Sequence, residues 1–489
     1  MNTLNLELLA GYQGAAQRPA YDRSRLSPAI VHLGIGAFHR AHQAVYIDDC
    51  LERDPHWAII GASLRRSDTR DALMPQNGLY TLAVRYGAAM RTRIIGAIVD
   101  VLHAPPDNAP VIAAIAAPET RMVTLTVTEK AYCRNPATGD LDLDHPDIRA
   151  DLEGHSGVRS VPGLLVAALA ARRRGGLGPI SLVSCDNLPD NGDTLAKVVH
   201  QYAVEAMPQL APWIEREVAF PATMVDRIVP ATTDDDRRAV AEATGYQDAW
   251  PVVTEPFSQW VVEDRFVAGR PPLDAAGALM VADVRPFEEM KLRLLNGSHS
   301  ALAYLGIQAG FETVSAAAAD PALRTFLDRM MRTEIIPTLD LQAVDLDAYA
   351  QSLLARFDNT ALKHRLMQIA MDGSQKVPQR LLGTIRDCEA AGRPHPHLDL
   401  AVAAWIRHLS GLGPDGRRFD VDDPMALRFV GIAEATLPDA EAFGAAILDL
   451  QSVFGADLSG DRRFRAAVLK LLRYLFDHGP AAAVSATGP

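Results

Sequence analysis

The sequence predicts an α/β fold, in which an N-terminal domain built on a parallel sheet precedes a mainly α-helical C-terminal domain. Over the first 285 residues, short apolar runs alternate with segments whose apolar positions recur at helical spacing. Beyond about residue 286, long periodic segments rich in Ala and Leu take over. The 489 residues also exceed the usual size of one hydrophobic core. We therefore expect two domains, residues 1–285 and residues 286–489.

The first elements predict a βαβ unit. Residues 29–34 (AIVHLG) are an apolar run that ends in glycine, and residues 37–50 follow with apolar positions at helical spacing. A second apolar run, residues 57–64 (WAIIGASL), ends in a charged stretch, as a parallel strand ends in a loop. Strand, tight turn, helix and strand is the simplest interpretation.

The remaining elements follow from the same patterns. Residues 161–174 predict a helix, because an apolar face ends in three arginines ahead of two glycines. Residues 479–489 lack a periodic apolar face and predict a frayed tail. Further strands are expected at residues 93–101, 122–128 and 180–185, and C-terminal helices at residues 288–305, 321–336, 362–371 and 461–476.

Charge and cysteine usage exclude several classes of function. Lys and Arg number 48 against 60 Asp and Glu, and the net charge of −12 repels nucleic acid and anionic membrane surfaces. The four cysteines show neither a CxxC pattern nor a zinc-ligand spacing, so we expect no disulfide framework and no metal. No signal peptide and no apolar run of about 18 residues is present, which favours a cytoplasmic protein.

The segment from residue 34 to residue 42, GIGAFHRAH, predicts a phosphate-binding turn. It follows the first strand and opens a helix, where backbone N–H groups favour a pyrophosphate, as in a Rossmann-like domain. Gly34 permits the tight turn and Gly36 allows a phosphate to approach, whereas His39 replaces the usual third glycine. Arg40 in the first helical turn favours a nearby anion. The predicted cofactor-binding residues of this turn are Gly34, Gly36, Phe38 and Arg40. The alternative is a turn that needs glycine and binds nothing.

The choice between NAD and NADP depends on the residues after the second strand. Asp68 is placed to accept a hydrogen bond from a free ribose 2′-hydroxyl, which favours NAD. Arg65 and Arg66 are close enough in sequence to suit a 2′-phosphate instead, and a solvated charged loop is the third alternative. We expect NAD.

The stretch KLRLLNGSH, residues 291–299, combines three functional side chains. On an α-helix, Lys291, Asn296 and His299 fall within an arc of about 140°. One side of the helix would then present an amine, an amide and an imidazole to a cleft. Taken singly, each side chain also has a structural interpretation, for example Lys291 as an ion-pair partner of Glu288 or Glu289.

These motifs, together with SCDNL at residues 184–188 and VDRIVP at residues 225–230, closely resemble the mannitol dehydrogenase family of polyol-specific long-chain dehydrogenases. The resemblance covers about residues 30–378. It implies NAD-dependent oxidation of a sugar alcohol such as mannitol, arabinitol or sorbitol to a ketose, by a monomer or weak homodimer. Two alternatives stay open: a reductase of a sugar acid such as fructuronate, and a nucleotide-binding protein without catalysis.

The resemblance also implies roles for individual residues. Lys291 matches the general base, and Asn187 and Asn296 match the amides that polarise the reacting oxygen. Asp226, His299 and Lys376 match substrate-binding positions, Glu288 a proton-relay carboxylate, and Glu129 a position near the nicotinamide. For a substrate-binding arginine the register is open, because Arg365 and Gln368 both match. A lysine base replaces the metal of zinc alcohol dehydrogenases and predicts more oxidation at alkaline pH.

Overall fold

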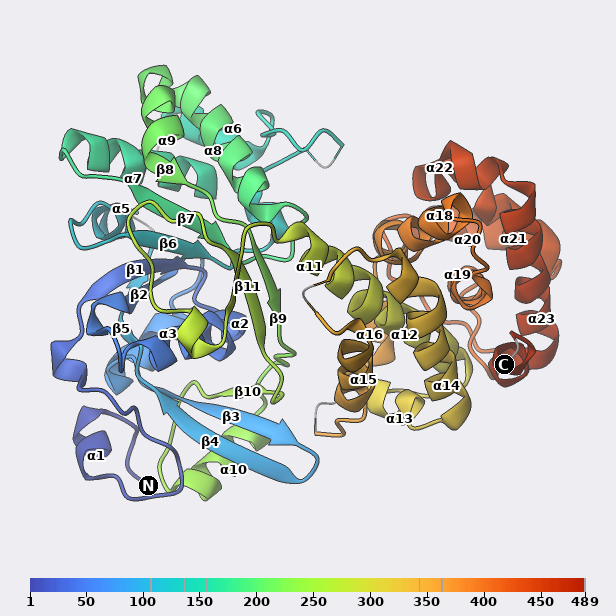
Figure 1. Ribbon diagram of the computed structural model, residues 1–489, viewed down its shortest axis with the longest axis horizontal. Coiled ribbons are helices and arrows are strands. Elements are labelled where there is room, and N and C mark those ends of the chain that lie inside the picture. The colour runs from blue at the N-terminus through green and yellow to red at the C-terminus, as the bar shows by residue number, and fades with distance from the viewer. Residues whose placement is uncertain (106–107, 136, 155–156, 343, 362–363, 488–489) are drawn as a thin grey trace. The chain divides into compact units, whose positions relative to one another are not determined.

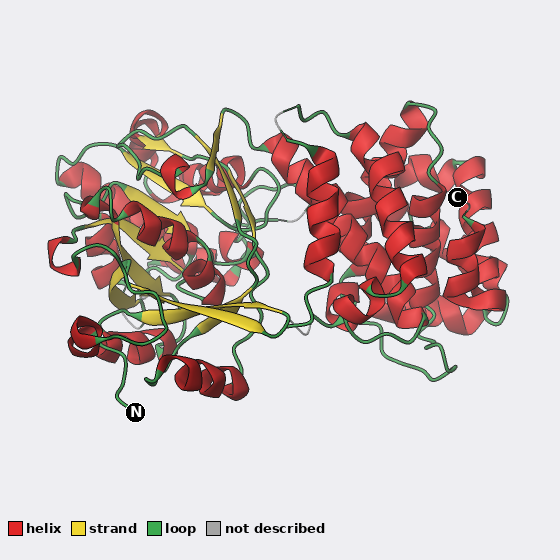
Figure 2. Cartoon of the chain, turned by 60° about the horizontal axis from the view of Figure 1, so that its bottom comes forward, coloured by secondary structure: helices red, strands yellow, loops and turns green. Residues whose placement is uncertain are grey.

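The computed structural model describes residues 1–105, 108–135, 137–154, 157–342, 344–361 and 364–487 (Figure 1). The chain divides into two compact units, Met1–Arg285 and Pro286–Pro489, called unit 1 and unit 2 below. Every described strand belongs to unit 1, and the described part of unit 2 consists of helices and loops (Figure 2). The predicted fold class is therefore confirmed.

The central sheet of unit 1 is parallel throughout its described part, with strand order β5-β2-β1-β6-β7-β8. The predicted βαβ unit is confirmed, since β1 pairs with β2 in parallel. The order reverses at β1, so the switch point lies between β1 and β6. The strands are β1 (Pro28–Leu33), β2 (Ala58–Ser63), β5 (Ile98–His103), β6 (Met122–Leu125), β7 (Ile180–Ser184) and β8 (Val218–Ala219).

Side chains that alternate along these strands enter two separate cores, one on each face. Val31 belongs to one core and Ile30 to the other. Period-2 alternation with both faces buried is what a parallel sheet between two helical layers requires. The helices of unit 1 are α1 (Leu6–Gly11), α2 (Ala37–Ala41), α3 (Gln43–Cys50), α4 (Asp68–Leu73), α5 (Ala109–Ile115), α6 (Pro146–Glu153), α7 (Val161–Arg174), α8 (Asn191–Ala206), α9 (Ala211–Glu217) and α10 (Asp234–Thr244).

Two details of the predicted N-terminal elements are wrong. The helix expected over residues 37–50 breaks at His42, whose φ of −124° and ψ of −89° separate α2 from α3. The strand expected over residues 93–101 is two strands of different sheets, because the chain turns at Gly96, whose N–H donates to the Asp48 carboxylate at 2.8 Å. The smaller sheets have the orders β10-β3-β4 and β12-β11-β9. Their strands are β3 (Tyr80–Tyr86), β4 (Ala89–Ile95), β9 (Thr223–Asp226), β10 (Val252–Thr254), β11 (Gln259–Glu263) and β12 (Leu279–Val281).

Unit 2 is built around α12 (Ser298–Gln308) and α19 (Pro396–His408), which pack against each other. All residues of α12 are buried, as expected of a helix enclosed on every side. The other helices are α11 (Arg285–Met290), α13 (Val314–Ala318), α14 (Pro321–Arg329), α15 (Leu346–Phe357), α16 (Leu366–Ala370), α17 (Gly373–Val377), α18 (Gly383–Ala390), α20 (Ala426–Thr436), α21 (Ala440–Leu448), α22 (Gln451–Gly460) and α23 (Arg462–Ala486). The described residues also include π-helical turns at Lys291–Gly297, Met330–Ile335 and Pro378–Leu382.

The C-terminal tail is more ordered than the sequence predicts. The chain kinks at Gly479, where φ is 75°, and then continues as a helix to Ala486. Ala483 and Val484 of this last segment are buried, so two apolar contacts stabilise a segment whose pattern is too short to show periodicity. Residues 488 and 489 lie outside the described residues, as do Leu362 and Lys363 of the predicted helix at residues 362–371.

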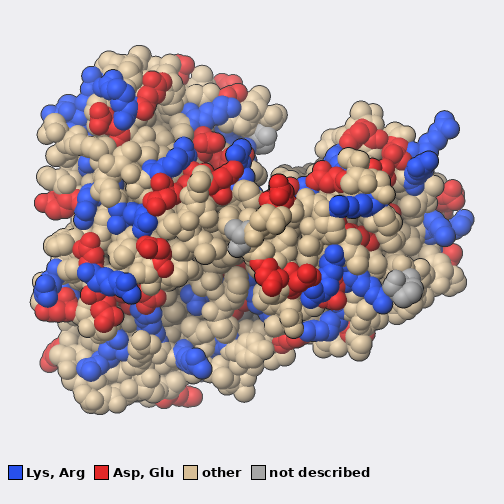
Figure 3. Space-filling model, viewed as in Figure 1, with Lys and Arg blue, Asp and Glu red and all other residues tan. Residues whose placement is uncertain are grey.

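On the face seen in Figure 3, Lys and Arg side chains alternate with Asp and Glu side chains over each unit. Among the described helices, none is both long and apolar enough to cross a membrane. The four cysteines are buried free thiols.

Candidate active site

A cavity of about 560 Å³ opens in unit 1 where four parallel strands end. The residues that line it follow β1, β2, β5 and β6, beside the switch point where open α/β sheets bind ligands. A volume of this size suits an extended organic ligand. The lining residues include Gly34, Gly36, Ser63, Arg65, Arg66, Thr69, Thr126, Thr128, Lys130 and Arg159.

Two glycines shape the turn at the edge of this cavity. Gly34 has a φ of 90°, and a Cβ atom there would overlap with the carbonyl oxygen of Thr126. A side chain is thus excluded both by the backbone conformation and by space. Gly36 is the N-cap of α2, and a Cβ there would meet only the Gly34 carbonyl at 3.8 Å, so this side of the turn is open to a ligand.

A pair of stacked imidazoles explains why the third glycine of the usual pattern is missing. His39 of α2 stacks on His32 of β1 with the ring centroids 3.3 Å apart and the planes 13° from parallel. Flat rings allow the helix to approach the strand, which is the packing role of that glycine. Both rings are buried, and burial lowers the pKa of His32 to about 3 and the pKa of His39 well below its ordinary value.

The stack predicts a loss of stability in mild acid. Unfolded histidine binds a proton below about pH 6.5, but the buried pair stays neutral, so the unfolded state gains protons and stability falls as the pH drops below 6.5. Each such histidine costs about 1.4 kcal/mol of unfolding free energy at pH 5.5 relative to neutral pH. Between about pH 7.5 and about pH 5.5, the unfolding free energy of His39→Phe should therefore fall less than that of wild type, by the contribution of one histidine. Denaturation curves at the two pH values measure this difference. An unchanged difference would contradict this assignment.

Four of the six predicted cofactor residues do not line the cavity, namely Phe38, Arg40, Asp68 and Glu129. Two of them, Arg40 and Phe38, point elsewhere. The Arg40 guanidinium is buried and donates to the Trp250 carbonyl at 2.5 Å, and Phe38 stacks on His42. Neither residue lines the cavity. A bound anion is therefore not needed to explain the charge of Arg40, because a carbonyl oxygen of the β10 region accepts its hydrogen bond.

The charged residues after β2 form an ion pair at the cavity. The Asp68 carboxylate lies 3.0 Å from Nη2 of Arg66, and Arg65 and Arg66 line the cavity. Asp68 thus offsets part of the positive charge that a 2′-phosphate would need. Glu129 pairs with Arg134 at 2.6 Å, beyond the strand end.

Thr128, next to Glu129, holds a strained backbone conformation. Its φ of 72° and ψ of 157° fall in a region that is almost restricted to glycine. The Asp186 carboxylate fixes this strand end, since it accepts the Thr128 N–H at 2.9 Å and the Val127 N–H at 3.1 Å. Asp186 was not among the predicted site residues, although it lies in the motif that contains Asn187.

Asn187 follows β7 by three residues and Asp226 ends β9, and a buried amide links the segment after β7 to the start of β9. Asn191 donates to the carbonyls of Asp186 at 3.0 Å and Thr223 at 2.7 Å, and it accepts the Thr223 N–H at 3.0 Å. Asn191 is 1% exposed, so these hydrogen bonds are shielded from water. No pattern in the sequence indicates the pairing of Asn191 with Thr223, because these two residues are 32 positions apart along the chain.

In unit 2, Lys291 and Asn296 belong to a π turn rather than to the expected α-helix. A π turn closes its hydrogen bonds between residues five apart, so these two side chains lie nearly one above the other instead of far around the helix. The turn packs against the π turn at Pro378–Leu382 through Gly297, where a Cβ would lie 2.9 Å from the Arg380 carbonyl. Arg293 anchors the opposite side through Glu289 and Asp387, at 2.5 and 2.6 Å.

His299 follows on the same helix with a partly unsatisfied ring. The imidazole is buried, its centroid lies 4.6 Å from that of Phe357, and Nε2 has no hydrogen-bond partner among the described residues. Burial, reinforced by the His364, Arg356 and Arg380 charges, lowers the pKa of His299 well below its ordinary value. The neutral ring can therefore exchange a hydrogen bond with a substrate hydroxyl.

The other predicted residues of unit 2 differ in their surroundings. Lys376 donates to the Met371 carbonyl at 2.7 Å and lies 3.6 Å from the Asp372 carboxylate. Glu288 is half-buried and precedes Lys291 by three residues, which places both on one face of the helix. Arg365 and Gln368 are both exposed around α16, so neither emerges as the better match.

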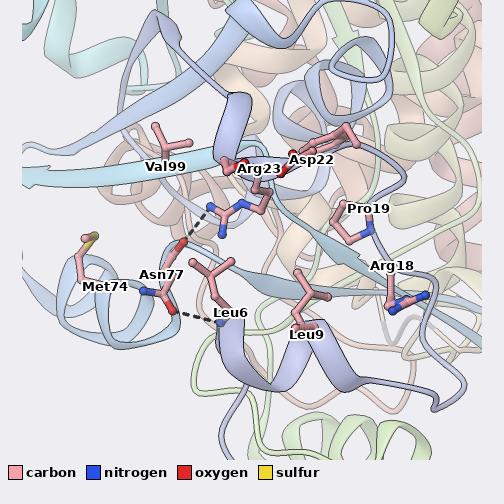
Figure 4. Close-up of a pocket in the computed structure, with 12 residues that line it drawn as sticks. Leu6, Leu9, Arg18, Pro19, Asp22, Arg23, Met74, Asn77 and Val99 are labelled. Carbon is pink, nitrogen blue, oxygen red and sulfur yellow. Dashed lines mark hydrogen bonds between the residues drawn. The ribbon is translucent and has the colours of Figure 1, made fainter.

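A second hollow in unit 1 contains none of the predicted residues (Figure 4). Its central cation, Arg23, donates to the carbonyls of Asn77, Gly96 and Ile98 at 2.8 to 3.0 Å. The guanidinium therefore links the N-terminal segment to the sheet, which is a structural role.

A cavity for an extended ligand at the carboxyl ends of a parallel sheet, beside a glycine turn that precedes a helix, is typical of oxidoreductases of the dehydrogenase class. The chain belongs to the mannitol dehydrogenase family: residues 28–275 match the mannitol dehydrogenase Rossmann domain and residues 283–475 match the mannitol dehydrogenase C-terminal domain. Across the described residues, no group of three or more His, Cys, Asp or Glu side chains could hold a metal ion.

Three relatives bear on the substrate. The chain is 44% identical to D-mannonate oxidoreductase of Escherichia coli (strain K12) over 96% of this chain and 97% of the relative. Mannitol 2-dehydrogenase of Pseudomonas fluorescens, solved as a ternary complex with NAD and D-mannitol, superposes with a TM-score of 0.85 at 36% identity and covers 99% of each chain. D-sorbitol dehydrogenase in substrate-free form superposes with a TM-score of 0.92 at 33% identity, over 99% of this chain and 100% of that one.

Proposed function

We propose that this chain is an NAD-dependent dehydrogenase that oxidises a secondary alcohol of a straight-chain polyol to the ketone, with Lys291 as the general base and without a metal. The candidate polyols are mannitol, arabinitol and sorbitol. The observation that carries the proposal is the π turn Lys291–Gly297, whose wider repeat favours a placement of Lys291 and Asn296 on one side of the helix. The solved relative with NAD and D-mannitol supports the choice of cofactor and substrate class.

Each residue has a defined task in this reaction. Lys291, with its amine neutral, accepts the hydroxyl proton while the same carbon loses its hydride, and Glu288 carries that proton onward. The Asn187 and Asn296 amides donate to the oxygen as negative charge develops, an effect worth a few kcal/mol per donor. Asp226 and His299 orient neighbouring hydroxyls, and Lys376 binds the substrate further along its chain.

NAD supplies the hydride acceptor when it is bound. The cavity beside Gly34 and Gly36 fits a dinucleotide, because its volume suffices and the turn leaves space that a Cβ would fill. The backbone of this turn would hold the pyrophosphate.

A second candidate substrate is a sugar acid such as mannonate, with fructuronate as the ketone. The specific observation in its favour is the pair of half-buried cations, Lys376 and Arg380, on adjacent turns of unit 2. The similarity to D-mannonate oxidoreductase of Escherichia coli supports the same candidate.

The proposal is tested by following NADH absorbance with NAD⁺ and a panel of mannitol, sorbitol, arabinitol and mannonate. We expect NAD-linked oxidation of at least one panel member that is unaffected by EDTA. Turnover that EDTA abolishes and added zinc restores, or no turnover with any of the four, would contradict the proposal.

Asp68→Ala is expected to shift cofactor preference toward NADP⁺. The substitution removes the carboxylate that pairs with Arg66 and would repel a 2′-phosphate, so kcat/KM for NADP⁺ should rise about 10-fold while that for NAD⁺ falls. Asp71→Ala on the same helix α4 is the matched control, since Asp71 pairs with Arg70, which does not line the cavity, whereas Asp68 pairs with Arg66, which does. If the ratio of kcat/KM for NADP⁺ to kcat/KM for NAD⁺ were the same in wild type and Asp68→Ala, Asp68 would have no role in cofactor choice.

A further inference from the structure

The chain after β6 forms one wall of the cavity in unit 1. Thr126, Val127 and Thr128 follow this strand and line the cavity. The Thr126 hydroxyl donates to the Gly34 carbonyl at 2.8 Å, and a Cβ on Gly34 would overlap with the Thr126 carbonyl oxygen. This wall and the glycine turn are therefore in contact, and a shift of one must move the other. The position of residues 126–128 thus decides the shape of the proposed pyrophosphate site.

Thr128 holds this wall in a conformation that a threonine does not adopt freely. Its φ of 72° and ψ of 157° lie in a region that is almost restricted to glycine, and a β-branched side chain raises the cost. Such a conformation persists only where the surrounding contacts enforce it. The wall would relax if these contacts were lost.

The contacts that enforce it come from Asp186, whose carboxylate accepts three hydrogen bonds. Oδ1 accepts the Thr128 N–H at 2.9 Å, and Oδ2 accepts the Val127 N–H at 3.1 Å and the Tyr132 hydroxyl at 2.8 Å. The backbone of Asp186 is held as well, because its carbonyl accepts a hydrogen bond from Asn191 at 3.0 Å. Asp186 is not among the residues that line the cavity. Its carboxylate therefore acts on the backbone of the wall rather than on a ligand.

We propose that Asp186 is a positioning residue for the cofactor, which holds the strained segment after β6 in the shape that NAD requires. The inference rests on the proposed function, because it takes NAD as the ligand of this cavity. A carboxylate can accept from two consecutive backbone N–H groups with both oxygens, and its charge strengthens both hydrogen bonds. A neutral amide would direct its own NH₂ group at one of these two donors.

Asp186→Asn tests this role, because it keeps the size of the side chain. We expect the Kd for NADH to rise about 30-fold in a fluorescence titration. Asp248→Asn is the matched control: Asp248 is buried in unit 1 and also accepts two backbone N–H groups and one side-chain donor, at 2.5 to 2.9 Å, but does not line the cavity. Both variants should lower the thermal unfolding midpoint, and the control should bind NADH within about 3-fold of wild type.

Thr128→Gly separates positioning from a general loss of stability. Glycine adopts the Thr128 conformation without strain, so the wall then depends less on the carboxylate. In the Thr128→Gly background, Asp186→Asn should therefore raise the Kd for NADH by less than about 5-fold, instead of about 30-fold. This comparison decides the matter even if Asp186→Asn alone does not fold.

Three results would overturn the assignment while the proposed function stands. They are wild-type affinity for NADH in Asp186→Asn, the same loss of affinity in Asp248→Asn, and a rise in Kd of about 30-fold within the Thr128→Gly background. A wild-type protein that binds no NADH would instead refute the proposed function, and the inference with it.

Discussion

Lys291→Ala is expected to lower kcat by about 10³-fold, because the loss of a positioned general base removes the acceptor of the hydroxyl proton. NADH binding should change little, since the residues proposed to bind the cofactor belong to unit 1. Equal losses in kcat and kcat/KM would show that the amine acts in the transition state rather than in ground-state binding. The measurement is steady-state oxidation with the best substrate of the panel, together with a fluorescence titration with NADH.

Lys470→Ala is the control, since Lys470 is exposed on α23. Added methylamine should restore part of the activity of Lys291→Ala and leave the control unchanged, because a small amine can replace the missing base. Parental turnover in Lys291→Ala would exclude the lysine as base and require another proton acceptor.

Local patterns were sufficient where each element depends on its own residues. The run that ends at Gly34 predicted β1 and its turn, and the three arginines before Gly175 predicted the end of α7. The lysine motif likewise identified the helix that carries Lys291, Asn296 and His299. These features could be predicted because hydrophobic periodicity and glycine turns act over a few residues.

Features that depend on distant contacts could not be predicted. At the π turn that contains Lys291, Gly297 closely approaches the Arg380 carbonyl, a contact that a helical repeat cannot reveal. Asn191 acts by linking the segment after β7 to the start of β9. In each case the deciding partner lies far away in the sequence, so spacing arguments had no access to it.

Gly34→Ala is expected to weaken cofactor binding while both units remain folded. The left-handed backbone of Gly34 costs an alanine about 1 kcal/mol, and the overlap of its Cβ with the Thr126 carbonyl adds about 1 to 3 kcal/mol. The turn must move to relieve this overlap, and the backbone groups that face the cavity move with it. We expect the Kd for NADH to rise by more than about 10-fold, with a lower thermal unfolding midpoint.

Gly277→Ala provides the comparison that separates ligand binding from general strain. Gly277 also has a left-handed φ, 91°, but a Cβ there would meet no atom within 4 Å, and the residue lies outside the cavity. This variant should lose about 1 kcal/mol of stability and keep its affinity for NADH. If both variants bound NADH equally well, the turn at Gly34 would not be the pyrophosphate site. A loss of NADH affinity confined to Gly34→Ala would instead assign the cofactor to the cavity beside β1. Both variants carry the backbone strain, but Gly34→Ala alone adds a steric overlap at a predicted phosphate contact.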